Sequence, residues 1–315
     1  MKSRQFQKIL FYGVLMSSMA GTQALAADDT AQNVPSQPEN VKKMAPMSGT
    51  PVSAAHTGGT IVPKGVLLST LSYSYRDKDD IVEDAGFGAR TMEQELYILK
   101  LRYGLTDHLE VIFVPGYIDM DRDAYGPFGS DHIDGSTDFF LGATYAPFLQ
   151  RLGDPLSFNM TFGVNMPTGQ EGPEHPVGGD VWSYTAKMGI TKIWHPNHRV
   201  DVDLGIVQPT ETGNQDVKKD TVWSITGGYK YVFNPTFDMG LEFTAENCRD
   251  WERNGINIQN GSTEVYVGPT MNYVIPKWKV WLGAGLYFPI VRDYDVATAT
   301  DDIRLEIKLG KIWSF

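Results

Sequence analysis

Along most of the chain, apolar and polar residues alternate one by one, a pattern typical of β-strands whose two faces meet different surroundings. The clearest example is the run 156–164. One of its faces carries only apolar residues: Leu156, Phe158, Met160, Phe162 and Val164. The other face is small and polar: Ser157, Asn159, Thr161 and Gly163. Nine residues are enough for a tilted strand to cross a bilayer, so the run is predicted to be a membrane strand.

Twelve segments show this alternation, near 66–75, 96–105, 109–113, 139–145, 156–164, 182–190, 200–206, 223–231, 237–244, 264–271, 278–288 and 303–309. Their connections alternate in length. Short turns lie at 106–108, 152–155, 195–198, 234–236 and 275–277. Long loops lie near 77–90, 120–135, 167–180, 208–220, 247–262 and 291–301. Because outer-membrane barrels have short periplasmic turns and long external loops, the sequence predicts an all-β, closed antiparallel transmembrane β-barrel of about 12 strands.

The first 58 residues do not follow this pattern. Lys2, Arg4 and Lys8 precede the apolar run Ile9–Ala20, and Ala24-Leu25-Ala26 has the form of a cleavage site, so residues 1–26 are predicted to be a signal peptide. Residues 27–58 are rich in Ala, Pro, Gln and Ser and lack periodicity, which predicts a flexible, disordered periplasmic leader. A short plugging helix there is the alternative. The barrel is then expected to occupy residues 59–315.

The two chain ends indicate which strand face meets lipid. The signal peptide directs export, and the C-terminus carries Phe315 with Trp313 two residues before it. A terminal aromatic residue after alternating apolar positions resembles the signal by which outer-membrane proteins are recognised for assembly. Rings also gather at strand ends, as expected of the girdles at the two membrane interfaces: Tyr145, Phe148, Trp182, Trp194, Tyr231, Phe233, Trp278, Phe288 and Trp313. We therefore expect a bacterial outer-membrane location, with lipid and the assembly machinery as partners.

Composition narrows the function classes. The formal net charge is −11, and it becomes −14 once Lys2, Arg4 and Lys8 leave with the signal peptide, which argues against a nucleic acid partner. Cys248 is the only cysteine, so no intrachain disulfide can form. The predicted loops near 77–90 and 120–135 are acidic, but their carboxylates match no EF-hand spacing and are expected to be solvated rather than to form a cation site.

Three motifs suggest a family. The segment from Tyr103 to Glu110 reads YGLTDHLE and resembles the YGLTDxLE turn of an outer-membrane transporter family named for the meta-pathway of phenol degradation. Gly135, Asp138, Leu141-Gly142 and Tyr145 are similar to its GxxDxxLGxxY segment, and Pro167-Thr168-Gly169 resembles its PTG. The resemblance covers the order of segments from about residue 60 to the end. It implies an outer-membrane barrel that passes small organic molecules, aromatic or hydrophobic ones among them.

The polar strand faces supply the candidate pore lining. Its predicted residues are Lys100, Arg102, Asp138, Asn159, Lys187, Asp201, Asp203, Lys230, Glu242, Glu264, Arg304, Glu306 and Lys308. Acids and bases occur in similar numbers, so strong ion selectivity is not expected. The function predicted from this lining is passive passage of a small solute. The alternative is a closed structural or surface-binding barrel that acts through its acidic loops, because twelve strands lie between filled and open barrels.

No constellation of residues predicts an enzyme. A rim protease would need a carboxylate and histidine pair, for which only His132, beside Asp131 and Asp134, and His175, beside Glu174, are candidates. A phospholipase would need a serine and histidine pair on the lipid face, and no outward strand position is expected to carry histidine. The six histidines show no metal-ligand spacing, so no metal and no cofactor are expected.

Overall fold

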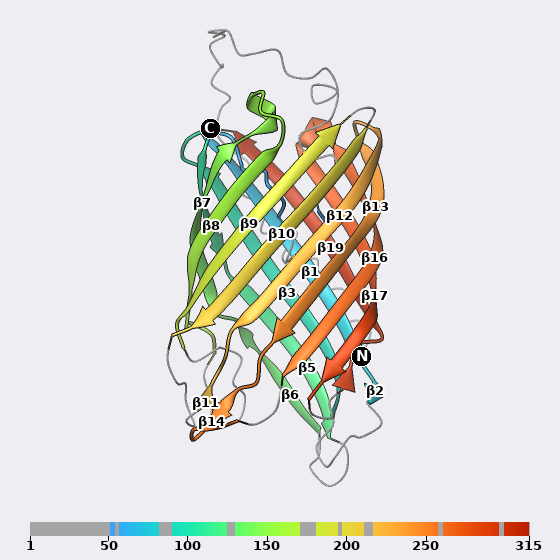
Figure 1. Ribbon diagram of the computed structural model, residues 1–315. Coiled ribbons are helices and arrows are strands. Elements are labelled where there is room, and N and C mark those ends of the chain that lie inside the picture. The colour runs from blue at the N-terminus through green and yellow to red at the C-terminus, as the bar shows by residue number, and fades with distance from the viewer. Residues whose placement is uncertain are drawn as a thin grey trace. The chain divides into compact units, whose positions relative to one another are not determined.

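The structure is a computed structural model, and it describes residues 51–53, 57–81, 90–124, 130–170, 181–194, 197–210, 217–257, 261–295 and 299–314. The predicted signal peptide, residues 27–50 of the predicted leader, His175 and Phe315 lie outside the described residues. The described strands form a closed, antiparallel twelve-stranded barrel, which confirms the predicted fold class (Figure 1).

The strands follow one another around the barrel in chain order. They are β1 (Val66–Lys78), β3 (Arg90–Gly104), β4 with β5 (Leu109–Val114 and Gly116–Ala124), β6 with β7 (Ser130–Ser136 and Phe139–Phe148), β8 (Ser157–Met166), β9 (Ser183–Trp194), β10 (His198–Pro209), β12 (Val222–Asn234), β13 (Phe237–Cys248), β16 (Ser262–Ile275), β17 (Val280–Tyr294) and β19 (Ile303–Ser314). The barrel closes at β1, where Leu68 lies opposite Ile312 of β19 and Arg102 of β3.

Two of the twelve strands are each broken into two parts. Pro115 separates β4 from β5, because proline has no N–H to donate to the ladder. The pairing of β5 with β6 is shifted by one residue from the pairing of β4 with β7. Thr137 N donates to Gly116 O at 3.0 Å across this break. The break is therefore a β-bulge, a feature that bends a strand locally.

The two ends of the barrel differ, as the loop lengths predict. At the short-turn end, 3-10 turns cover η1 (Gln150–Leu152) and η3 (Pro276–Trp278), so β17 begins at Val280 rather than at Trp278. At the other end, β5 and β6 extend far into the predicted loop 120–135. Two small sheets lie there, one of β2 (Asp80–Ile81) with β18 (Ala299–Thr300), and one of β11 (Val217–Lys218), β14 (Glu252–Arg253) and β15 (Ile256–Asn257).

The two faces of the wall have opposite polarity. Large apolar side chains are exposed on the outside, with Phe162 at 62% and Leu241 at 52%. Charged side chains are enclosed, with Glu242 and Lys230 at 1% and Asp238 at 0%. A water-soluble barrel would show the reverse, so the outer face is the surface that meets lipid. No helix in the described ranges is long and apolar enough to cross a membrane.

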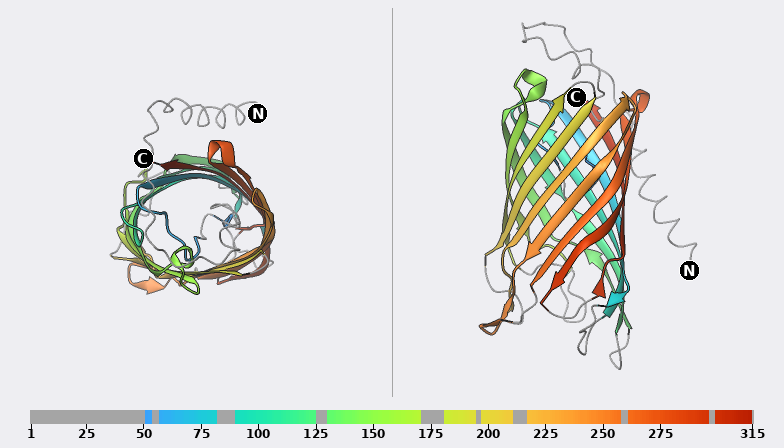
Figure 2. Two further views of the ribbon diagram at one scale, coloured as in Figure 1. Left: turned by 90° about the horizontal axis from the view of Figure 1, so that it is seen from above. Right: turned by 45° about the vertical axis from the view of Figure 1, so that its right-hand side comes forward.

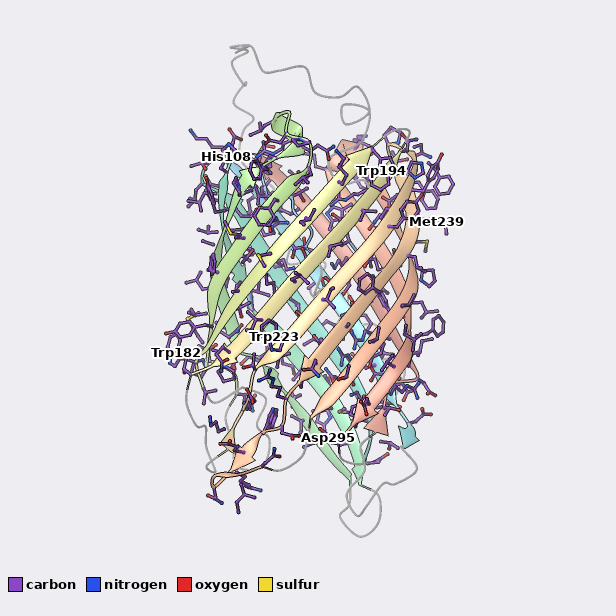
Figure 3. The ribbon with its side chains drawn as sticks, viewed as in Figure 1. His108, Trp182, Trp194, Trp223, Met239 and Asp295 are labelled. Atoms are coloured by element: carbon purple, nitrogen blue, oxygen red, sulfur yellow. The ribbon has the colours of Figure 1, made fainter. Side chains whose placement is uncertain are left out.

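Aromatic residues mark the two edges of the apolar band. Trp194 lies near the short-turn end, and Trp182 and Trp223 lie near the opposite end (Figure 3). Strand β9 runs between Trp182 and Trp194, and with about 3.3 Å per residue and a tilt near 40° it rises roughly 28 Å. That height matches the hydrocarbon core of a bilayer. His198, the first residue of β10, lies on this outward face, and its ring stacks on that of Trp194 with 5.8 Å between the ring centroids. This corrects the expectation that no outward strand position carries histidine.

Candidate functional site

A segment of the chain that precedes β1 lies inside the barrel. Residues 51–53 and 57–62 contact the inner wall, and Figure 2 shows this part of the chain, in blue, within the ring of strands. Val52 and Ser53 are 0% and 2% exposed. We call residues 51–53 and 57–64 the inserted segment. It crosses the predicted boundary at 58/59 between the leader and the barrel.

Three carboxylates of the wall accept hydrogen bonds from backbone N–H groups of the inserted segment. Glu242 accepts from Val52 at 2.7 Å and from Ser53 at 2.9 Å. Asp203 accepts from Thr57 at 2.5 Å and Gly58 at 2.9 Å. Glu110 accepts from Val62 N at 2.7 Å. Such charge-assisted bonds are stronger than neutral ones, so each carboxylate holds the segment firmly.

The segment's carbonyl groups are bound in turn by donors of the wall. Asn159 Nδ2 donates to Gly58 O at 2.9 Å, and Arg102 Nη2 donates to Thr60 O at 2.9 Å. Lys308 Nζ donates to Ser53 O at 2.6 Å and to Pro51 O at 3.2 Å. The wall thus binds both polar groups of an irregular backbone, which is required wherever backbone is buried away from water.

Two of these three wall carboxylates, Glu242 and Glu110, have buried basic partners. Glu242 lies 2.7 Å from Lys230 Nζ and accepts from the Tyr287 hydroxyl at 2.9 Å. Glu110 pairs with Arg102 at 2.8 Å. A buried charge without a partner is costly, so these pairs allow acidic side chains to stand inside the wall and still bind the segment.

Apolar contacts fix the end of the segment nearest β1. Val62 packs in a buried cluster with Leu68, Val274 and Trp281, and Ile61 packs in a second cluster with Ala146 and Leu149. Gly310 of β19 lies under Trp281, where a Cβ would overlap the indole nitrogen. The glycine therefore makes room for the tryptophan that covers Val62.

The predicted lining residues fall into groups by contact. Five of them touch the inserted segment directly: Arg102, Asn159, Asp203, Glu242 and Lys308. Lys230 supports Glu242, and Asp201 is held by Arg199 at 2.7 Å. The remaining strand positions stand on the inner faces of their strands: Lys100, Lys187, Glu264, Arg304 and Glu306. Glu110, Arg199, Asp238 and Tyr287 were missed, although all four follow the same alternation.

Arg304 belongs to a second polar cluster on the side of the long loops. Its guanidinium lies 3.9 Å from the centroid of the Tyr266 ring, and its Nη2 is 3.6 Å from Asp301. The Tyr266 hydroxyl donates to Asp301 at 2.7 Å, and Lys78 Nζ lies 3.6 Å from the same carboxylate. Glu264 accepts a hydrogen bond from the Tyr294 hydroxyl and lies near Lys78. Basic and acidic groups alternate here, so the cluster has no strong excess of either charge.

Asp138 has a local role at the bulge between β6 and β7. Its carboxylate accepts from Gly169 N at 3.0 Å, and Phe139 N donates to the Thr168 hydroxyl at 3.0 Å. Gln170 N adds a bond to Ser136 O at 3.0 Å. Two of the sequence motifs, the one around Asp138 and the one at 167–169, therefore contact each other and fasten the bulge.

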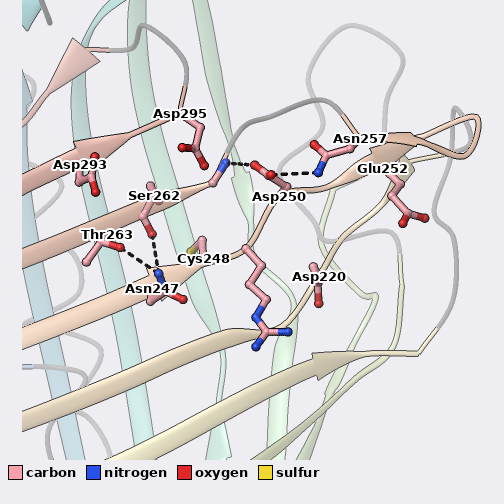
Figure 4. Close-up of a pocket in the computed structure, with 12 residues that line it drawn as sticks. Asp220, Asn247, Cys248, Asp250, Glu252, Asn257, Ser262, Thr263, Asp293 and Asp295 are labelled. Atoms are coloured by element: carbon pink, nitrogen blue, oxygen red, sulfur yellow. Dashed lines mark hydrogen bonds between the residues drawn. The ribbon is translucent and has the colours of Figure 1, made fainter.

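The external end carries polar clefts and titratable groups. A cavity of about 410 Å³ is lined by Asp220, Arg249 and Asp250 among others (Figure 4). Hydrogen bonds from Asn257 and from Gly261 N hold the pKa of Asp250 below its usual value. On the β5–β6 hairpin, a hydrogen bond to Asp121 raises the pKa of His132. Among the described residues, no three His, Cys, Asp or Glu side chains are placed to hold a metal ion.

Comparison with known proteins places these features in a family. The model of the family described as "Putative MetA-pathway of phenol degradation" matches residues 78–291. Among solved structures, an outer membrane channel from Pseudomonas putida F1 superposes with a TM-score of 0.66 at 15% identity, over 80% of this chain and 97% of that one. The β domain of the Bordetella autotransporter BrkA gives a TM-score of 0.48 at 12% identity, over 80% and 100% of the two chains.

The likeness to solved structures concerns the fold. The comparison with curated proteins gave no match. The closed barrel, its lipid-facing band and its two aromatic belts are those of a bacterial outer-membrane protein. The family model covers about two thirds of the sequence, and the motifs at Gly104, Asp138 and Thr168 lie within the matched residues. The chain therefore belongs to the family of the putative MetA-pathway of phenol degradation.

Proposed function

We propose that this protein is an outer-membrane channel that gives passive passage to small organic solutes, aromatic or hydrophobic ones included. The observation that carries the proposal is the interior wall. The wall forms a closed ring and is rich in charges and hydroxyls. Several inward positions, such as Lys100 and Lys187, are partly exposed. A channel needs a hydrated lumen and a constriction, and the inserted segment supplies the constriction. The solved relative that shares the fold is named an outer membrane channel, which agrees with this proposal.

The inserted segment then controls how wide the channel is. It reaches from the short turns, where Glu110 binds it, to the middle of the strands, where Asp203 and Glu242 bind it. A solute would pass beside the segment or displace it. Weakening the carboxylates that hold it should therefore widen the passage.

Planar-bilayer recording of the refolded mature chain tests the proposal. The double variant Asp203→Asn with Glu242→Gln should raise single-channel conductance or open time, because both changes weaken bonds to the inserted segment. Glu264→Gln is the matched control, since it removes an interior carboxylate that lies away from those bonds. Absence of current and of solute-driven liposome swelling in all three proteins would contradict a channel.

One observation also favours a second function. The buried hydrogen bonds of the inserted segment are consistent with a permanently closed barrel that acts at the cell surface through its acidic external loops. Shortening the β5–β6 hairpin between Asp121 and His132 separates the two functions. A channel keeps its conductance after this change, whereas a surface binder loses its partner. We propose the outer-membrane assembly machinery as a further partner, because it would recognise Trp313 and Phe315.

A further inference from the structure

Apart from the two buried clusters that pack on the inserted segment, one further part of the interior wall is apolar, in contrast to the many charged and hydroxylated residues of that wall. It extends over β3 to β7 and consists of Leu96, Ile98, Val114, Ile118, Ile133 and Phe140, which we call the apolar strip. Interior positions of membrane barrels that contain water are usually polar. An apolar patch on such a wall therefore requires an explanation.

The register places the strip on the inner face. On β3, Ile98 and Leu96 have the same parity as Arg102, which is enclosed and binds the inserted segment. Leu96 lies opposite Ile118, and Val114 lies opposite Phe140. Directly opposed residues of antiparallel strands point to the same side of the sheet, so these four side chains face the interior.

The strip is not a hidden packing core. Ile133 is buried, at 2% exposed, but Leu96, Ile98, Val114, Ile118 and Phe140 are all partly exposed, although they point into the barrel. None of them belongs to the two buried clusters that hold Ile61 and Val62 of the inserted segment. Their exposed surface therefore faces the interior beyond the described part of that segment.

Phe140 gives the strip a flat end. Its ring lies against Gly142 and Gly163, where a Cβ on either glycine would overlap ring carbons. Residues with side chains at these two positions would push the ring away from the wall. The two glycines thus let an aromatic ring lie along the wall, next to Val114.

Polar residues flank the strip on the same inner face of β3. Gln94 stands two residues before Leu96, and Lys100 stands two residues after Ile98. Both are partly exposed. A solute on the strip would therefore meet apolar carbon in the middle and an amide or ammonium group at the ends.

We infer that the apolar strip is a binding surface for neutral amphipathic solutes, which place a nonpolar ring or alkyl face on Ile98 and its neighbours and a hydroxylated part toward Gln94 or Lys100. The inference rests on the proposed channel function and specifies its solute class. A purely polar solute gains nothing from the strip, and a purely apolar one makes no hydrogen bond to the polar groups that flank it.

A pair of glucosides that differ only in the presence of a ring tests this surface. Phenyl glucoside and methyl glucoside are added to the refolded mature protein in planar bilayers, and the length of each interruption of the ion current is measured. Phenyl glucoside should remain longer in the wild-type channel. Ile98→Asn should shorten its stay about tenfold, because it removes roughly three methylene equivalents of apolar contact with partial burial. The stay of methyl glucoside should not change.

Two further variants control for changes of shape. Ile98→Leu keeps the apolar surface and should retain the long stay. Ser224→Asn places an amide on the inner face of β12, away from the strip, and should have little effect. If Ile98→Asn does not fold, Leu96→Ser removes the adjacent part of the strip instead.

The outcomes separate this inference from the channel function. Equal residence of both glucosides in the wild type, or no change in Ile98→Asn, overturns the inference while the channel remains. If no protein carries current, the channel function fails, and binding is then measured by saturation-transfer NMR in lipid nanodiscs. Loss of phenyl glucoside binding in Ile98→Asn alone would still support the surface, and equal binding by wild type and variant would overturn it.

Discussion

Lys230 Nζ lies 2.7 Å from Glu242 Oε1, and both side chains are 1% exposed. The two residues differ in the hydrogen bonds that each would retain if the other were removed. Glu242 also accepts from Val52 N, Ser53 N and the Tyr287 hydroxyl, whereas Lys230 also donates to the Thr270 hydroxyl. Glu242 therefore joins the barrel wall to the inserted segment.

This asymmetry predicts unequal effects of mutation. Glu242→Gln should lower the free energy of unfolding by about 3–5 kcal/mol, because it leaves a buried ammonium without its carboxylate. Lys230→Met should cost less, since Glu242 retains three donors. Urea unfolding in detergent micelles, followed by tryptophan fluorescence, measures both. A larger loss of unfolding free energy in Lys230→Met than in Glu242→Gln would contradict the conclusion that Glu242 joins the wall to the inserted segment.

Gly104 should be needed for the inserted segment. A Cβ at this position would overlap the carbonyl of Pro63, and backbone cannot move away as a flexible side chain can. Gly104→Ala should therefore destabilise the protein by about 1–3 kcal/mol and speed amide exchange at residues 57–64. Gly116→Ala is the control, because its Cβ would meet the Thr137 hydroxyl, which can rotate. Similar exchange in both variants would refute the role of Gly104.

The β5–β6 hairpin should be less stable at high pH. His132 Nδ1 lies 2.7 Å from Asp121, and this bond raises the pKa of His132; Asp119 and Asp134 lie 3.7 Å from the ring. Because the folded pKa is raised, the stabilisation is fully present below the unfolded value near 6.5 and is lost as pH rises through the folded pKa.

Hydrogen exchange of the hairpin amides at pH 5.5 and pH 8.5, corrected for intrinsic rates, measures this effect. Exchange should be slower at pH 5.5 in the wild type. Asp121→Asn should remove most of the difference, because the largest cause of the raised pKa is gone. Identical protection at both pH values in the wild type would show that His132 does not contribute.

The C-terminal residues should matter for assembly more than for the folded wall. Trp313 Nε1 donates to Ser69 Oγ at 3.0 Å, so Ser69→Ala removes that bond but leaves the terminal aromatic pattern intact. We expect Phe315→Ser to lower the amount of folded protein in the outer membrane several-fold and Ser69→Ala to leave it almost unchanged. Quantifying the folded, heat-modifiable band in membrane fractions compares them. Equal amounts would argue against an assembly signal.

The barrel could be predicted from sequence because each strand has two faces in different surroundings. The alternation at 156–164 is visible because Phe162 meets lipid and Thr161 meets the enclosed interior, and the same contrast recurs in twelve strands. Gly104 was recognised only as part of the YGLTD sequence motif. Its physical reason, the Pro63 carbonyl packed against Gly104, depends on a contact between distant segments.

The inserted segment could not be predicted in the same way. Its contacts with Glu242, Asp203 and Asn159 are made by backbone N–H and C=O groups, which every sequence possesses. A segment bound in this way needs no periodic side chains. The sequence indicates the apolar strip, because residues 96–99 are apolar on both faces of one strand. On that strand, however, only the charged residues Lys100 and Arg102 were predicted to line the pore.

Because the inserted segment continues directly into β1 through Gly65, it is a tethered ligand of its own barrel. A free peptide that left its site would diffuse away, whereas this one stays at an effective concentration in roughly the millimolar range. Any solute that displaces it must compete with immediate rebinding. Open intervals should therefore be brief and self-terminating, and the barrel should reclose without any partner protein.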